Sequence, residues 1–183
     1  MRIKSWAIGT FTIFTLTTAC SSPPPPPPDT HPLGNVTAAP QECELISASA
    51  IKIATGFKDY TAVGTKMKRG LFASCSVAED LSAAGKLGLV IEVFDPSPND
   101  PEDLENTKVF TGGTDLPARL GPGFTMRRKS SEGQTIASVY GWTPDYQRLL
   151  TIDIYRGAPG RDSLADATEF FRQLKPVLLD KPK

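Results

Sequence analysis

The chain has 183 residues, and its 20 basic and 20 acidic side chains give a net charge of zero. This balance gives no electrostatic argument for a nucleic-acid partner, which usually requires a strongly basic surface. The single histidine, His31, lies in a proline-rich stretch near the start. The folded part of the chain therefore cannot contain a Ser–His–Asp triad, a Cys–His pair or a His-based metal site.

The first twenty residues have the pattern of a lipoprotein signal peptide. Arg2 and Lys4 form a short basic region, which an uncharged and mostly apolar run follows. That run of about 14 residues is too short to span a bilayer but fits the apolar region of a secretory signal. Ala19 directly precedes Cys20, as in the bacterial lipobox. We expect residues 1–19 to be removed and Cys20 to be acylated, which would anchor the protein on the outer face of the cell membrane.

Residues 20–42 are predicted to form a tether between the lipid anchor and a folded domain. They contain six consecutive prolines, Pro23 to Pro28, which favour a semi-rigid polyproline II helix. We therefore expect one globular domain in residues 43–183, which is the length of an ordinary single domain.

The cysteines indicate a disulfide bond in this domain. With Cys20 assigned to lipid, Cys43 and Cys75 remain, and two such cysteines in an exported protein most simply form one disulfide. Closing a loop of about 33 residues would stabilise the fold by about 3–4 kcal/mol on the chain-entropy model. A metal or redox pair is disfavoured because neither a nearby histidine nor a CxxC spacing is present. No metal ligand and no cofactor are expected.

The first part of the domain is predicted to contain one helix and two strands. Apolar residues recur at helical spacing from a cap at Ser47 or Ser49 to Gly56, which can end the helix. Apolar residues alternate in residues 70–79, as in a half-buried strand. Residues 86–94 give the strongest strand signal and are apolar on both faces, so we expect a central strand there.

Residues 95–113 are predicted to contain a second helix. Asp100 can cap its start and Pro101 can occupy its first position, whereas Gly112 and Gly113 can end it. Several acidic residues in this stretch suggest calcium at first sight. They lack the ligand spacing of a calcium loop, so we interpret them as residues of a helix start.

The second half of the domain is predicted to contain three strands and a final helix. A strand within residues 120–134 is followed by a hairpin of residues 135–142 and 148–156. The helix has a capping-box pattern at Ser163 and Asp166, and a proline near its end that would end or kink it.

This order of elements favours an α+β domain with an antiparallel sheet and about three helices. Four aromatic side chains are expected in the core or at its rim, namely Tyr140, Trp142, Phe170 and Phe171. The alternative is that they line a groove for a ligand.

The residues Cys43-Glu44-Leu45-Ile46-Ser47 and Cys75, together with the lipobox and the proline-rich tether, resemble a family of small actinobacterial lipoproteins. This family, found in mycobacteria and nocardiae, has a domain of unknown function with a cysteine pair. The resemblance implies a cell-envelope protein and carries over no activity.

The functional prediction follows from what the chain lacks. It contains no GxSxG, no SxxK and no phosphate-binding glycine loop, so we do not expect an enzyme. Catalysis by two carboxylates that meet in space is the alternative that the sequence leaves open. The leading hypothesis is a lipid-anchored module that binds or scaffolds an envelope partner. The rival hypothesis is a carrier of a lipid or another apolar ligand, which would need a cavity. The sequence identifies no ligand-binding residues for either role.

Overall fold

The computed structural model describes residues 27, 29–67, 71–80, 82 and 86–180. The predicted signal peptide and the lipid attachment site at Cys20 lie outside these residues. Among the described residues, no helix is long and apolar enough to span a membrane.

A seven-stranded antiparallel sheet forms the centre of the domain, with the strand order β3-β4-β5-β9-β8-β7-β6. The strands are β3 (Thr61–Lys66), β4 (Phe72–Ala78), β5 (Leu87–Phe94), β6 (Thr114–Asp115), β7 (Gly123–Lys129), β8 (Thr135–Trp142) and β9 (Leu149–Ile154). A two-stranded sheet of β1 (Gln41–Glu42) and β2 (Ile46–Ser47) lies before the first helix. The predicted α+β class with an antiparallel sheet and three helices is confirmed.

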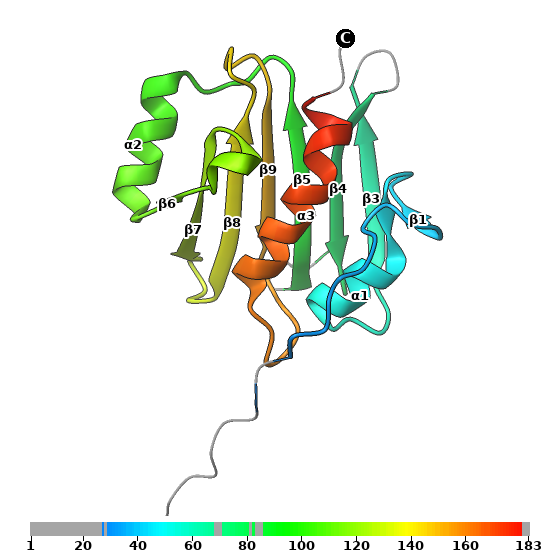
Figure 1. The fold of residues 1–183 in the computed structure, drawn as a ribbon. Coiled ribbons are helices and arrows are strands. Elements are labelled where there is room, and N and C mark those ends of the chain that lie inside the picture. The colour runs from blue at the N-terminus through cyan, green and yellow to red at the C-terminus, as the bar shows by residue number, and fades with distance from the viewer. Residues whose placement is uncertain (1–26, 28, 68–70, 81, 83–85, 181–183) are drawn as a thin grey trace, which may run out of the picture.

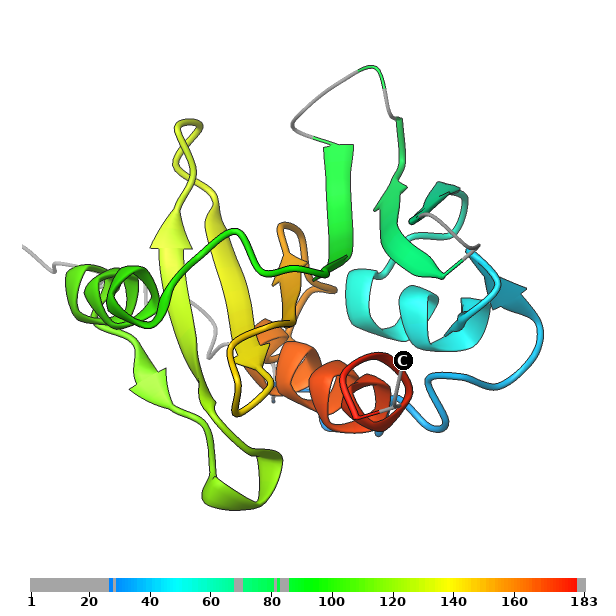
Figure 2. The ribbon, with the colours of Figure 1, turned by 90° about the horizontal axis from the view of Figure 1, so that it is seen from above.

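The sheet consists of two meanders, β3-β4-β5 and β6-β7-β8-β9, which meet where β9 pairs with β5. The helices are α1 (Ala48–Thr55), α2 (Pro101–Thr111) and α3 (Ser163–Leu178), with a short 3₁₀ helix, η3, at Ala118–Leu120. Helices α1 and α3 lie on one face of the sheet, and α2 lies beside β7 (Figures 1 and 2). Helices α1 and α3 therefore cover one face of the sheet, whereas on the other face the end of α2 contacts only the β7 side, at Phe124.

The main core lies between the sheet and helices α1 and α3. Alternate residues of the central strands, such as Ile91 and Ile152, pack there against Phe170 and Phe171 of α3, and all four side chains are fully buried. Gly141 on β8 lets α3 approach closely, because a Cβ atom at this position would lie 2.1 Å from the ring of Phe171. This packing positions the sheet and leaves β5, β9 and β8 without a helix on the other face.

Two helices have the ends that the sequence predicts. Gly56 ends α1 in the left-handed conformation with a φ of 73°. Asp100 accepts a hydrogen bond from the Asp103 backbone at the start of α2, Pro101 is its first residue, and Gly112 ends it. These ends depend on the local backbone preferences of single residues, which can be predicted from the sequence.

The start of the final helix differs from the prediction. Its cap is Asp162 and not Ser163, because the Asp162 carboxylate accepts the backbone N–H groups of Leu164 and Ala165. Pro176 lies inside α3 and does not end it. It falls in the last turn, where little of the helix follows it.

Between α1 and α2 the structure has three strands, whereas the sequence predicts two. The additional strand is β3, which forms an edge of the sheet and is mostly exposed. An edge strand with little burial has no alternation of apolar and polar residues, so the sequence contains no signal for it.

The packed domain begins before Cys43, within the stretch predicted to be a tether. Leu33 and Val36 lie in the core, with exposures of 4% and 0%. The side chain of Gln173 on α3 accepts a hydrogen bond from the Val36 N–H and donates one to the Gly34 carbonyl. Residues 29–42, which we call the N-terminal segment, therefore belong to the domain.

Candidate functional site

The candidate site is the face of the sheet that points away from α1 and α3, which we call the open face. Figure 2 shows that no helix lies over β5, β9 and β8 on this side. A sheet face without helices normally carries polar, solvated side chains. On the open face, however, several polar side chains are buried.

The strand register places the side chains of the open face in rows across the sheet. One row consists of Thr65, Ser74, Glu92, Thr151, Tyr140 and Phe124. The next row consists of Val63, Ser76, Val90, Asp153, Ser138 and Met126. Arg128 and Tyr155 lie beyond these rows, with the Arg128 guanidinium 5.9 Å from the centre of the Tyr155 ring. We define the open-face cluster as six of these residues: Glu92, Arg128, Ser138, Tyr140, Asp153 and Tyr155.

Asp153 is the most unusual member of the cluster, because its carboxylate is buried at only 6% exposure. It accepts a hydrogen bond from the hydroxyl of Ser138, which is fully buried. The nearest cation is Arg128, whose Nη2 lies 3.8 Å from Oδ1 of Asp153. Burial raises the pKa of Asp153, and the hydrogen bond from Ser138 and the charge of Arg128 oppose this effect.

Glu92 and Tyr140 adjoin this carboxylate and respond to it. Burial raises the pKa of Glu92, and the negative charge of Asp153 raises it further. Burial is also the main cause that raises the pKa of Tyr140, with a contribution from Asp153. In the described part of the chain, neither Glu92 nor the hydroxyls of Tyr140 and Tyr155 have a hydrogen-bond partner. Their polar groups are therefore available to a ligand.

The buried carboxylate predicts a dependence of stability on pH. Because the pKa of Asp153 is raised in the folded protein, the folded state binds more protons than the unfolded chain between the ordinary aspartate pKa and the raised one. Stability is therefore lost as pH rises through this window. The variant Asp153→Asn keeps an acceptor for Ser138 and cannot ionise.

We expect the free energy of unfolding of Asp153→Asn, relative to wild type, to be higher at about pH 7 than at about pH 4. Urea unfolding at both pH values measures it. A relative stability that does not change with pH would contradict the burial of an ionised Asp153.

Aromatic side chains lie on the same face near the turn between β8 and β9. The rings of Phe124 and Tyr140 stack with centroids 5.1 Å apart, and Trp142 stacks on Tyr146 at 6.0 Å. Trp142 also meets Phe124 edge-on. Tyr140 and Trp142 are half-buried, so they form the rim of the domain, whereas Phe170 and Phe171 are in its core. The prediction of core or rim positions is confirmed for all four side chains.

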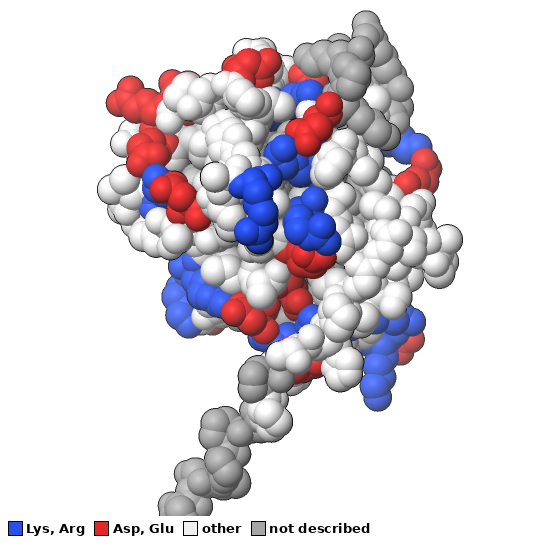
Figure 3. Space-filling model, viewed as in Figure 1, with Lys and Arg blue, Asp and Glu red and all other residues white. Residues whose placement is uncertain are grey.

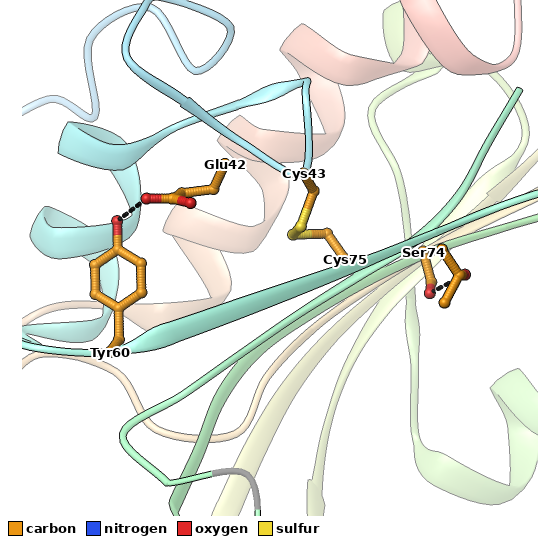
Figure 4. The surroundings of a disulfide bond; sticks show 6 residues. Glu42, Cys43, Tyr60, Ser74 and Cys75 are labelled. Carbon is orange, nitrogen blue, oxygen red and sulfur yellow. Dashed lines mark hydrogen bonds between the residues drawn. A yellow bond between two sulfur atoms is a disulfide. The ribbon is translucent and has the colours of Figure 1, made fainter. Parts of the chain in front are cut away.

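The structure contains the predicted disulfide bond between Cys43 and Cys75, whose Cα atoms are 5.8 Å apart (Figure 4). It joins the turn between β1 and β2 to strand β4. Next to it, the Tyr60 hydroxyl donates a hydrogen bond of 3.1 Å to Glu42, and burial together with Glu42 raises the pKa of Tyr60 to about 12. This region fastens the start of the domain to the sheet and forms no part of the open-face cluster.

The sequence does not show which two acidic side chains come near each other. On the open face they are Glu92 and Asp153, which come from neighbouring strands β5 and β9 and interact through their charges. A signal for both was present, because each is an acidic residue within a strongly apolar strand, in LVIEVF and LLTIDIY. A charged residue inside such a run is seldom buried without a specific reason.

The remaining surface offers two other features. The face that bears the helices has Lys, Arg, Asp and Glu side chains mixed over it (Figure 3). A shallow hollow next to α1 is lined by Pro40, Ala48, Ser49, Lys52 and Ile53, and it is open to solvent. Ligand pockets for apolar molecules usually enclose most of their ligand, so this hollow does not have that form. Within the described ranges, no group of three or more His, Cys, Asp or Glu side chains is arranged to hold a metal ion.

Comparison with known proteins adds no assignment: no family model matches the chain, and no match was found among curated proteins or solved structures.

Proposed function

We propose that this protein is a lipid-anchored binding module of the cell envelope, which binds an envelope partner through its open face and catalyses no reaction. The observation that carries the proposal is the buried carboxylate of Asp153 on the part of the open face that no helix covers. Burying a carboxylate costs free energy unless its partners compensate. Here the partners are one hydroxyl and one guanidinium 3.8 Å away. A role in binding accounts for a costly group that the main core does not need.

The composition of the open face supports a binding role. Tyrosine, tryptophan and arginine are the side chains that contribute most to binding at protein surfaces, and Tyr140, Trp142 and Arg128 lie on this face. They lie on two neighbouring strands of a rigid sheet, β7 and β8, so their positions are fixed before a partner arrives. A site positioned in this way loses little conformational entropy on binding.

The start of the domain supports an anchored role. The backbone of Asp29 donates a hydrogen bond to Gly160, and its carboxylate lies 3.2 Å from the guanidinium of Arg161. If Cys20 carries lipid, about eight residues separate the anchor from this fixed point, or roughly 25 Å in the polyproline II form that the sequence predicts. The domain would then be held near the membrane, where an envelope partner is within reach.

The arrangement of groups favours binding over catalysis. Ser138, the only serine in the open-face cluster, is fully buried and donates its hydroxyl to Asp153. His31 lies in the N-terminal segment, with a side chain that is 86% exposed and bonded to Asp29. A nucleophile activated by histidine is therefore not assembled at the cluster.

The test of this proposal is whether the open face is occupied in the intact envelope. Hydroxyl-radical labelling of Tyr140 and Tyr155 should be weaker in intact envelopes than in purified protein, because a bound partner shields the rings. Equal labelling in both samples would overturn the proposal.

A further inference from the structure

We propose that the ligand of the open-face cluster is a glycan, a chain of linked sugar rings rich in hydroxyl groups. This inference rests on the proposed function and names the chemical class of the partner. The polar groups of the cluster, the aromatic rings beside them and the position of both on the sheet support it.

The free polar groups of the cluster match a ligand that both donates and accepts hydrogen bonds. The Glu92 carboxylate only accepts, the Arg128 guanidinium only donates, and the hydroxyls of Tyr140 and Tyr155 do both. Sugar hydroxyls also do both, so each of these four groups can bond to the same kind of partner. Ser74, a cross-strand neighbour of Glu92, adds a further hydroxyl in the same row, which shares a hydrogen bond of 2.7 Å with the hydroxyl of Thr65.

The charges of the cluster argue against an ionic ligand. A cation held between Glu92 and Asp153 would lie close to the guanidinium of Arg128, because that group faces Asp153 at 3.8 Å. An anion at Arg128 would meet the negative charge of Asp153. A neutral and strongly polar ligand avoids both conflicts.

The aromatic side chains supply the apolar contact that a sugar ring needs. The faces of sugar rings carry C–H groups, which pack on aromatic rings, while their edges carry hydroxyls. Tyr140 is held flat against Phe124 at an interplanar angle of 6°, and Trp142 and Tyr146 stack next to this pair. Aromatic rings with an apolar body and a polar tip suit a surface that is partly wet.

The distribution of polarity argues against a protein as the direct ligand of the cluster. Protein interfaces usually have an apolar centre and a polar rim. On β5, β9 and β8 the apolar Val90, Leu149 and Ile136 of the open face are buried. The partly exposed side chains there are the polar Glu92, Tyr140 and Tyr155, with the aromatic Phe94 and Trp142 at one end of these strands. Glu92 and Tyr140 are two strands apart, or roughly 10 Å, so linked sugars would lie across the strands.

Binding to insoluble glycans tests this inference. The mature lipoprotein, kept in detergent, is mixed with protein-free peptidoglycan, with chitin and with cross-linked dextran, and with sugar-free polystyrene beads as a control. We expect retention on at least one glycan and elution by soluble fragments of that glycan. Glu92→Gln and Tyr140→Phe should each weaken binding at least about tenfold, because each leaves a sugar hydroxyl without its partner. The matched variant Glu102→Gln, on the exposed side of α2, should bind like wild type.

Circular dichroism and urea unfolding show whether the variants are folded, and both changes keep the size of the side chain. Retention on no glycan, or equal retention of all variants, would overturn the inference. If Tyr140 is shielded in intact envelopes and no glycan binds, the ligand class is wrong and the binding module remains, with a protein as its partner. If Tyr140 is not shielded either, both proposals fail.

Discussion

Replacing Arg161 with leucine is expected to lower the free energy of unfolding by about 3–5 kcal/mol. The Arg161 side chain is only 4% exposed and donates two hydrogen bonds, of 2.6 and 2.8 Å, to the carboxylate of Asp166. The Asp166 side chain is 8% exposed, so loss of Arg161 leaves a buried charge without its partner. Arg161 also contacts Asp29, and the N-terminal segment should therefore loosen in the variant.

Urea unfolding measures the loss of stability, and limited proteolysis before residue 43 measures the loosening. The matched control is Arg172→Leu, which removes an exposed pair with Glu169 and should lower the free energy of unfolding far less than Arg161→Leu does. The double variant Arg161→Leu, Asp166→Leu should recover much of the stability, because it leaves no buried charge unpaired. A loss below about 1 kcal/mol for Arg161→Leu alone would show that the pair is not a buried contact.

Replacing both Cys43 and Cys75 with alanine is expected to lower the free energy of unfolding by about 3–4 kcal/mol. The two residues are 32 positions apart, so the disulfide removes much of the freedom of the unfolded chain between them. The bridge also holds Cys43 against Gly64 of β3, where a Cβ atom would lie 3.0 Å from the Cys43 Cβ. Without the bridge, the edge of the sheet loses this link to the turn before α1.

Thermal unfolding with and without a reducing agent measures the effect. Wild type should lose stability when it is reduced, whereas the double alanine variant should unfold at the same temperature in both conditions. A variant as stable as oxidised wild type would contradict the structural role of the bridge.

The sequence predicted the elements whose signals are local. The start and end of α2 follow from Asp100, Pro101 and Gly112, which act through the backbone of their own turn. Strand β5 follows from its apolar residues, and the disulfide from the count of cysteines. The α+β class follows from the order of these elements.

Features that depend on tertiary contacts were not predictable in this way. Leu33 and Val36 are isolated apolar residues in a proline-rich stretch, and only their packing in the core and the bonds from Gln173 show that they belong to the domain. Strand β3 depends on pairing with β4 along an exposed edge. Asp162 and Ser163 are adjacent, and the sequence allows either of them to cap α3. In the structure the carboxylate of Asp162 accepts the free N–H groups of the first turn, so Asp162 is the cap.

The candidate site could be identified only from the strand order and register of the folded sheet. Glu92 and Asp153 are far apart in the chain and meet because β9 inserts next to β5. Two acids in apolar strands mark each strand as unusual, but the sequence does not state which strands are neighbours. Because successive side chains of a strand point to opposite faces of the sheet, both carboxylates lie on the open face.

Radical labelling of the aromatic side chains in intact envelopes tests most directly whether the open face is the binding surface. Tyr140 and Tyr155 report on this face, and Phe110 on α2, which is 92% exposed, is the reference side chain. We predict that Tyr140 and Tyr155 are labelled several-fold less in the envelope than in purified protein, whereas Phe110 is labelled equally in both. Shielding of Phe110 with unchanged labelling of Tyr140 and Tyr155 would place the partner on another surface and contradict the account.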